Sequence, residues 1–185
     1  TNEDIRYLWP PWDPVVKWGS GTRPVMALSL ALNYSMSGLN TWGYHFVNLV
    51  IHLLNACVLF DLVRRALLRL KSFANVSTFL SLTVVLCWVA HPLNTESVTY
   101  ITQRNESLMS LFLLLTLYCV ERGNSSQTSS IHYGLAVLFC ALGMGTKQNM
   151  AATPLLVLLY DRTFLSGSFR NALHSRRWLY LGLAG

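Results

Sequence analysis

The chain has 185 residues, of which 52% are hydrophobic and only 12% are charged. Soluble domains carry about twice that charged fraction, so the composition argues against a soluble protein and predicts an integral membrane protein. The net charge of +6 does not indicate nucleic-acid binding, because the basic residues lie in short loops between apolar segments.

Residues 1–42 are expected to form an external segment before the first membrane span. Within it, "LWPPWDPVVKW" places Trp9, Trp12 and Trp18 in a context that suits the lipid headgroup level. The following "RPVMALSLALNYSMSG" is amphipathic but too polar to span. It is therefore predicted to lie along the outer interface or to re-enter the membrane shallowly.

The remainder, 43–185, is predicted to be a polytopic, all-α membrane domain, a helical bundle that is incomplete at both ends. Five segments have the length and polarity of membrane helices, and a sixth begins near Trp178. Because the chain opens without an initiator Met and closes on a short apolar segment, we expect a longer parent protein. The five predicted spans are 43–63, 76–90, 107–120, 131–145 and 150–165.

The distribution of lysine and arginine predicts which side of the membrane each connection faces. Three connections on one side hold nine of the 14 basic residues, whereas the other side holds five over a longer stretch. This excess marks the first side as cytoplasmic and the loop at 91–106 as external. External means periplasmic for a bacterial inner membrane and lumenal for the endoplasmic reticulum. The nine residues are Arg64, Arg65, Arg69, Lys71, Arg122, Arg162, Arg170, Arg176 and Arg177.

The cysteines and aspartates of the apolar segments are assigned structural roles. Cys57, Cys87, Cys119 and Cys140 lie singly, with no CxxC pair. Neither a zinc site nor a disulfide framework is expected, and all four are interpreted as small buried hydrophobic residues. Ion pairs at cytoplasmic helix ends are expected for Asp61 with Arg64 and Arg65, and for Asp161 with Arg162.

The first predicted span contains a stripe of polar side chains. His45, Asn48, His52 and Asn55 fall within about 80° of arc on a helix, so this stripe should face other helices or a wet cavity. Two interpretations stay open, interhelical hydrogen bonding and the lining of a polar site. Metal binding by the two histidines is disfavoured, because this spacing separates them by about 10 Å along the helix axis.

The external loop "HPLNTESVTYITQRNESL" carries four ionisable groups in a short space. Pro92 is expected to end the second span at His91. Downstream, Arg104 either pairs with a neighbouring carboxylate in a solvated loop or contributes to a site at the membrane surface. The short spans on both sides pull the loop toward the bilayer and favour the second interpretation.

Lys147 lies in "LGMGTKQNM", a tight external turn between two apolar helices. A lone lysine at a membrane edge is often a snorkelling anchor. With Arg23 and Arg104 on the same face, however, three cations can converge near the outer boundary. Such a cluster suits a membrane-held anion such as a lipid phosphate.

Three segments, in this order and spacing, resemble a known family. They are "RPVMALSLALNYSMSGLNTWGYHFVNLVIHLLNA", "HPLNTESVTYITQRNESL" and "GMGTKQNMAATPLLVLLYDRTF". Together they resemble the membrane region of the TPR-containing protein O-mannosyltransferases and their bacterial relatives. These are GT-C-fold glycosyltransferases that depend on polyprenyl-phosphate sugars.

The resemblance implies a helical membrane enzyme that moves sugar from a lipid-linked donor to an acceptor protein or glycan on the external or lumenal side. An acidic residue would activate the acceptor hydroxyl, and cations would steady the leaving lipid phosphate. It implies no covalently bound cofactor and leaves metal dependence open. The candidate phosphate ligands are Arg23, Arg104 and Lys147, and the candidate pocket residues are His45, Asn48, His52, His91 and Glu96.

Two departures from the family pattern bear on activity. The acidic pair of the first external loop is expected upstream of Thr1, and Gln148 stands where relatives usually carry glutamate after the lysine. The fragment alone is therefore expected to be inactive. The alternative to a transferase is a non-catalytic membrane subunit, derived from that fold, that packs with other membrane subunits. A transporter would need internal repeats or broken helices, and the sequence shows neither.

Overall fold

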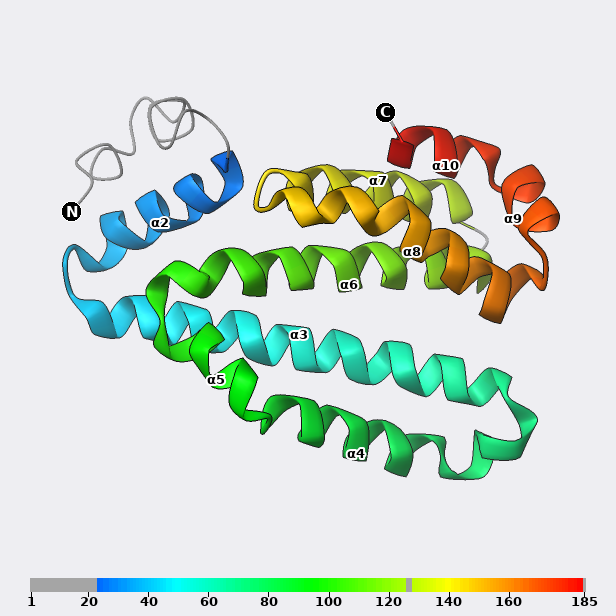
Figure 1. Ribbon diagram of the computed structural model, residues 1–185, viewed down its shortest axis with the longest axis horizontal. Coiled ribbons are helices and arrows are strands. Elements are labelled where there is room, and N and C mark those ends of the chain that lie inside the picture. Colours follow the sequence, from blue (N-terminus) through cyan, green and yellow to red (C-terminus); the bar gives the residue numbers. More distant parts are fainter. Residues whose placement is uncertain (1–22, 126–127, 185) are drawn as a thin grey trace.

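The computed structural model describes residues 23–125 and 128–184, and every regular element in these two ranges is a helix (Figure 1). The all-α prediction is therefore confirmed for the described part of the chain. The three tryptophans that were predicted for the headgroup level lie outside the described residues.

The first described helix is α2 (Pro24–Ser37). It starts with proline, which lacks a backbone N–H, and this is tolerated because N–H groups in the first turn have no partner within the helix. At its end Gly38 has a φ of 56°, a value that favours glycine. Asn40 then caps the next helix, because its side chain accepts a hydrogen bond from the Trp42 backbone N–H at 3.1 Å. The predicted interfacial segment is thus a helix followed by a sharp turn.

The longest element is α3 (Thr41–Arg69), and it contains the first predicted span. The chain returns through η3 (Lys71–Val76) and α4 (Ser77–Val89), which packs antiparallel beside α3 (Figure 1). Short elements α5 (Pro92–Thr99) and η4 (Ile101–Gln103) lead into α6 (Arg104–Ser125), which packs along α3 on its other side.

The second half of the chain packs against the opposite face of α6. α7 (Ser129–Met144) runs back along it, and α8 (Thr153–Tyr160) and α10 (Arg177–Ala184) lie beyond (Figure 1). The fifth predicted span is divided into three helical types, which are η5 (Gln148–Ala152), α8 and the π-helix η6 (Asp161–Ser166). The predicted sixth span begins within α10, after the short helix α9 (Phe169–Ser175).

Two helical segments, Thr41–Arg69 and Lys71–Val89, are long and apolar enough to cross a membrane. Large apolar side chains on both are exposed, for example Leu53 on α3 and Phe79 and Leu86 on α4. Only 17% of the apolar window in the second segment is buried inside the molecule. Such surface suits contact with lipid rather than water, but the number of spans stays a prediction.

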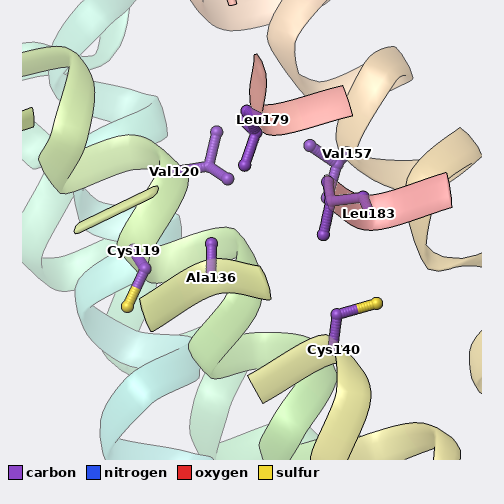
Figure 2. Close-up of a cluster of buried hydrophobic side chains, with 7 residues drawn as sticks. All are labelled: Cys119, Val120, Ala136, Cys140, Val157, Leu179 and Leu183. Atoms are coloured by element: carbon purple, nitrogen blue, oxygen red, sulfur yellow. The ribbon is translucent and has the colours of Figure 1, made fainter. Parts of the chain in front are cut away.

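The main hydrophobic core joins α6, α7, α8 and α10 (Figure 2). Figure 2 shows Val120 and Ala136 facing Val157, Leu179 and Leu183 across this seam. Cys119 and Cys140 belong to the same cluster and are buried, as predicted, and all four cysteines are free. The prediction of burial was wrong for Cys57 and Cys87, which are exposed on the outer faces of α3 and α4.

A buried ion pair anchors the C-terminal helices to this core. Arg176 Nη1 lies 2.6 Å from Asp161 Oδ1, with the two side chains 8% and 0% exposed. Tyr180 donates to the second Asp161 oxygen at 2.7 Å, and Arg176 Nε donates to the Tyr133 hydroxyl at 3.0 Å. Asp161 was predicted to pair with Arg162, and the structure pairs it with Arg176 instead. Asp61 pairs with Arg65 at 2.8 Å as predicted, whereas Arg64, its other predicted partner, donates to the Thr78 hydroxyl at 3.2 Å.

Replacing Arg176 by alanine should destabilise the fold strongly. The substitution leaves the Asp161 carboxylate buried without its cation, and breaking such a pair costs about 3–5 kcal/mol. The free energy of unfolding of the full-length, detergent-solubilised protein measures this loss. Arg170→Ala, an exposed arginine on α9, is the matched control, and equal losses in the two variants would show that the buried pair is not special.

Candidate functional site

A polar pocket of about 340 Å³ lies between α3, the end of α4, α5 and the start of α6. Its lining combines carboxylates, amides, hydroxyls and an aromatic pair, although α3 and α4 belong to the two segments that are long and apolar enough to cross a membrane. The lining includes His52, Asn55, Trp88, Glu96, Glu106 and Ser107.

The local sequence places the pocket at the break between α4 and α6. Pro92 starts α5, and His91 before it is extended, with φ −66° and ψ 129°. The His91 imidazole accepts a hydrogen bond from the Leu93 backbone N–H at 3.2 Å. His91 therefore caps α5 and is exposed, whereas Glu96, four residues after the proline, lines the pocket.

The polar stripe of α3 performs both of the functions that were considered for it. Towards the helix start, the His45 ring contacts the Val98 carbonyl at 3.3 Å, and Asn48 accepts a hydrogen bond from Arg104 at 2.7 Å. One to two turns further on, His52 and Asn55 line the pocket. The first pair holds the connection to α6 in place, and the second pair forms a polar wall.

Arg104 lies at the junction of three helices, and its side chain is fully buried. Its guanidinium donates to Asn48 on α3 at 2.7 Å and to Asn33 on α2 at 2.8 Å, and to the Tyr44 carbonyl at 3.1 Å. These partners are neutral oxygens, so the structure does not show the first of the two interpretations of Arg104, pairing with a neighbouring carboxylate in a solvated loop. Burial lowers the pKa of Arg104 to about 10, so the group remains a cation at neutral pH. In this geometry Arg104 joins α2, α3 and α6, and its charge is not open to a ligand.

Lys147 forms an ion pair with Glu106, which is itself part of the pocket lining. Both side chains are partly exposed, at 25% and 36%, so the lysine is at the rim of the pocket and accessible to a ligand. The turn that carries it is held by a hydrogen bond from the Thr146 hydroxyl to the Gly143 carbonyl at 2.6 Å. Its backbone geometry is therefore fixed independently of the ion pair.

Arg23 lies near this turn because it directly precedes α2, the start of which contacts the turn. The Val25 N–H donates to the Gly145 carbonyl at 3.1 Å, so the start of α2 touches the Gly143–Lys147 turn. A Cβ at Gly145 would lie 2.6 Å from Val25, which explains why glycine is needed here. The structure thus brings the Arg23 backbone and Lys147 into one neighbourhood, with the Arg23 side chain exposed.

Several pocket residues were not singled out from the sequence. Glu106 belongs to the external loop and was not proposed as a site residue, and Trp88 lies within an apolar segment. The Trp88 ring stacks on His52 with centroids 4.9 Å apart. Its position one helical turn before the His91-Pro92 break is the sequence feature that could have identified Trp88 as a pocket residue. In the described ranges, no group of three or more His, Cys, Asp or Glu side chains is arranged to hold a metal ion.

Comparison with known proteins gives the context for this geometry. The family model described as dolichyl-phosphate-mannose-protein mannosyltransferase matches residues 21–185. The chain belongs to this family. No solved structure matches it.

Individual relatives agree with the family model. Protein O-mannosyl-transferase TMTC2 of Mus musculus is 35% identical over 147 residues, which cover 69% of this chain and 16% of that protein. Protein O-mannosyl-transferase TMTC3 of Homo sapiens is 30% identical over 124 residues, which cover 67% of this chain and 13% of that protein. TMTC1 of Homo sapiens is 28% identical over 169 residues, which cover 80% of this chain and 18% of that protein. These matches confirm the resemblance to the O-mannosyltransferases, and the chain spans less than a fifth of the length of these relatives.

Replacing Arg104 by lysine should destabilise the fold although it keeps the charge. A single ammonium group cannot reach Asn33, Asn48 and the Tyr44 carbonyl together, so at least one buried acceptor loses its partner, at a cost of about 2 kcal/mol. Thermal unfolding of the full-length protein in detergent measures this. Arg122→Lys, an exposed arginine on the same helix, should change little, and an equal effect there would contradict the assigned role of Arg104.

Proposed function

We propose that this chain supplies one wall of the donor site in a membrane glycosyltransferase. In this proposal the enzyme moves mannose from a dolichyl-phosphate-mannose type of donor to a protein hydroxyl on the external or lumenal side. The family description names this donor and a protein mannosyltransferase activity. The observation that carries the proposal is the polar pocket with the Lys147–Glu106 pair at its rim, set between helices whose outer faces are apolar.

The two ends of such a donor match the two kinds of surface on this chain. A polyprenyl tail needs lipid-like contacts, and the exposed leucines and phenylalanines of α3 and α4 provide them. The phosphate needs a cation at the membrane boundary, and Lys147 is a partly exposed one. In the proposed complex, the lipid phosphate replaces Glu106 as the partner of the lysine.

The proposed reaction is a displacement at the anomeric carbon of the sugar. The acceptor oxygen attacks this carbon, the bond from the carbon to the phosphate oxygen breaks, and its electron pair leaves with the lipid phosphate. The hydroxyl proton passes to a carboxylate, which the family pattern leads us to expect upstream of Thr1. Lys147 lowers the barrier by stabilising the negative charge that grows on the leaving phosphate.

Substituting Lys147 by alanine in the full-length protein should reduce mannosyl transfer about a hundredfold, the usual cost of losing one stabiliser of a developing anion. Transfer from dolichyl phosphate mannose to an acceptor peptide measures this. Lys71→Ala removes an exposed lysine at the opposite end of α3 and is the control. Unchanged transfer in Lys147→Ala would make this lysine a membrane anchor, and an inactive unmodified full-length protein would favour the non-catalytic subunit.

The proposed orientation places α5 outside and η3 in the cytoplasm. A cysteine at Leu93, which is 77% exposed, should react with a membrane-impermeant maleimide added to the external or lumenal side. A cysteine at Ser72 on η3 should react only after the membrane is permeabilised. The background replaces the exposed Cys57 and Cys87 by alanine, and the reverse labelling pattern would overturn the orientation.

A further inference from the structure

Two buried polar atoms in the candidate pocket have no hydrogen-bond partner. They are Asn55 Oδ1 and Ser107 Oγ, and in residues 23–125 and 128–184 no other buried side-chain nitrogen or oxygen is in this state. Both residues line the pocket and are almost fully buried, with exposures of 1% and 5%. Since buried polar groups are normally paired, such atoms call for a specific explanation. We call this pair of residues the pocket floor.

The orientation of the Asn55 amide is fixed by its neighbours. Its nitrogen donates to the Ile51 carbonyl and to the Ser107 carbonyl, each at 3.0 Å. Carbonyl oxygens only accept, so the nitrogen must face them and the amide oxygen must face elsewhere. The floor therefore holds one amide oxygen of fixed orientation on α3 and one hydroxyl on α6, which can donate or accept. Both atoms lie beneath the pocket lining, so a ligand reaches them when the lining side chains shift.

This arrangement selects for hydroxyl groups and against anions. An unpaired amide oxygen needs a donor, and an ionised phosphate oxygen has no hydrogen to give. The carboxylates of Glu96 and Glu106 in the same lining also accept hydroxyl hydrogens and repel negative charge. The stacked rings of His52 and Trp88 add a flat wall to the pocket. A volume of about 340 Å³ is at the small end of ligand pockets, a size suited to a single sugar.

We propose that Asn55 and Ser107 bind the hydroxyl groups of the donor hexose and that the floor excludes the donor phosphate, which lies at Lys147. This inference rests on the proposed function and deepens it, because it assigns the two ends of one donor to two parts of the site. It makes Ser107 a determinant of affinity for the sugar and not for the lipid phosphate.

The test is Ser107→Ala in the full-length protein, assayed by binding of two lipids, dolichyl phosphate mannose and dolichyl phosphate. Affinity for the mannosylated lipid should fall about tenfold, the equivalent of one hydrogen bond to a ligand, and affinity for dolichyl phosphate should not change. The melting temperature should stay the same or rise, because the hydroxyl has no internal partner to lose. By contrast, Lys147→Ala should weaken binding of both lipids.

The matched control is Thr116→Val, which removes a buried hydroxyl from the same helix. The Thr116 hydroxyl donates to the Phe112 carbonyl at 2.7 Å, so this variant should lower the melting temperature and leave both affinities unchanged. If Ser107→Ala binds both lipids as the unmodified protein does, the sugar assignment is wrong and the hydroxyl is satisfied by water or within the fold. If the unmodified protein binds neither lipid, the proposed function fails as well.

Discussion

The site depends on the buried guanidinium of Arg104. A cation in such a position is tolerated only when each of its hydrogens finds an acceptor, and here the acceptors come from α2 and α3. These bonds fix the rotation of α6 at its first turn. Glu106 and Ser107, two and three residues further along α6, are thereby directed to the Lys147 turn and to Asn55. One arginine therefore sets the positions of the rim and the floor of the pocket.

The remaining charges keep the other end of the bundle together. Glu121 on α6 is buried and pairs with Arg69 of α3 at 2.7 Å, and Tyr160 of α8 donates to its second oxygen at 3.2 Å. The pair of Asp161 and Arg176 lies next to the same helices. Ionic contacts thus concentrate at the two ends of the long helices, and the surface between them is apolar. This distribution is the one expected of a helical membrane protein.

Hydrophobic runs alone predicted the positions of α3, α4, α6 and α7, because each run is long and bounded by polar residues. They did not predict the division of the fifth span, where the backbone hydrogen-bonding pattern changes from 3-10 to α and then to π. The function of Arg104 was also out of reach, since its partner Asn33 lies 71 residues earlier in the chain. For the same reason the pairing of Lys147 with Glu106, 41 residues apart, needed the structure. Local patterns identify helices and polar stripes, but they do not say which polar groups meet.

The pocket floor places two polar residues, Asn55 and Ser107, in an otherwise apolar interface between α3 and α6. The same α3–α6 interface contains a hydrophobic cluster of Ile51, Leu108 and Leu111, so an alanine at position 107 would pack there without difficulty. A buried hydroxyl without a partner instead costs about 1–3 kcal/mol. Packing does not explain this cost, whereas the proposed sugar ligand would supply the missing hydrogen bonds when bound. Functional sites are where proteins commonly retain such unfavourable groups.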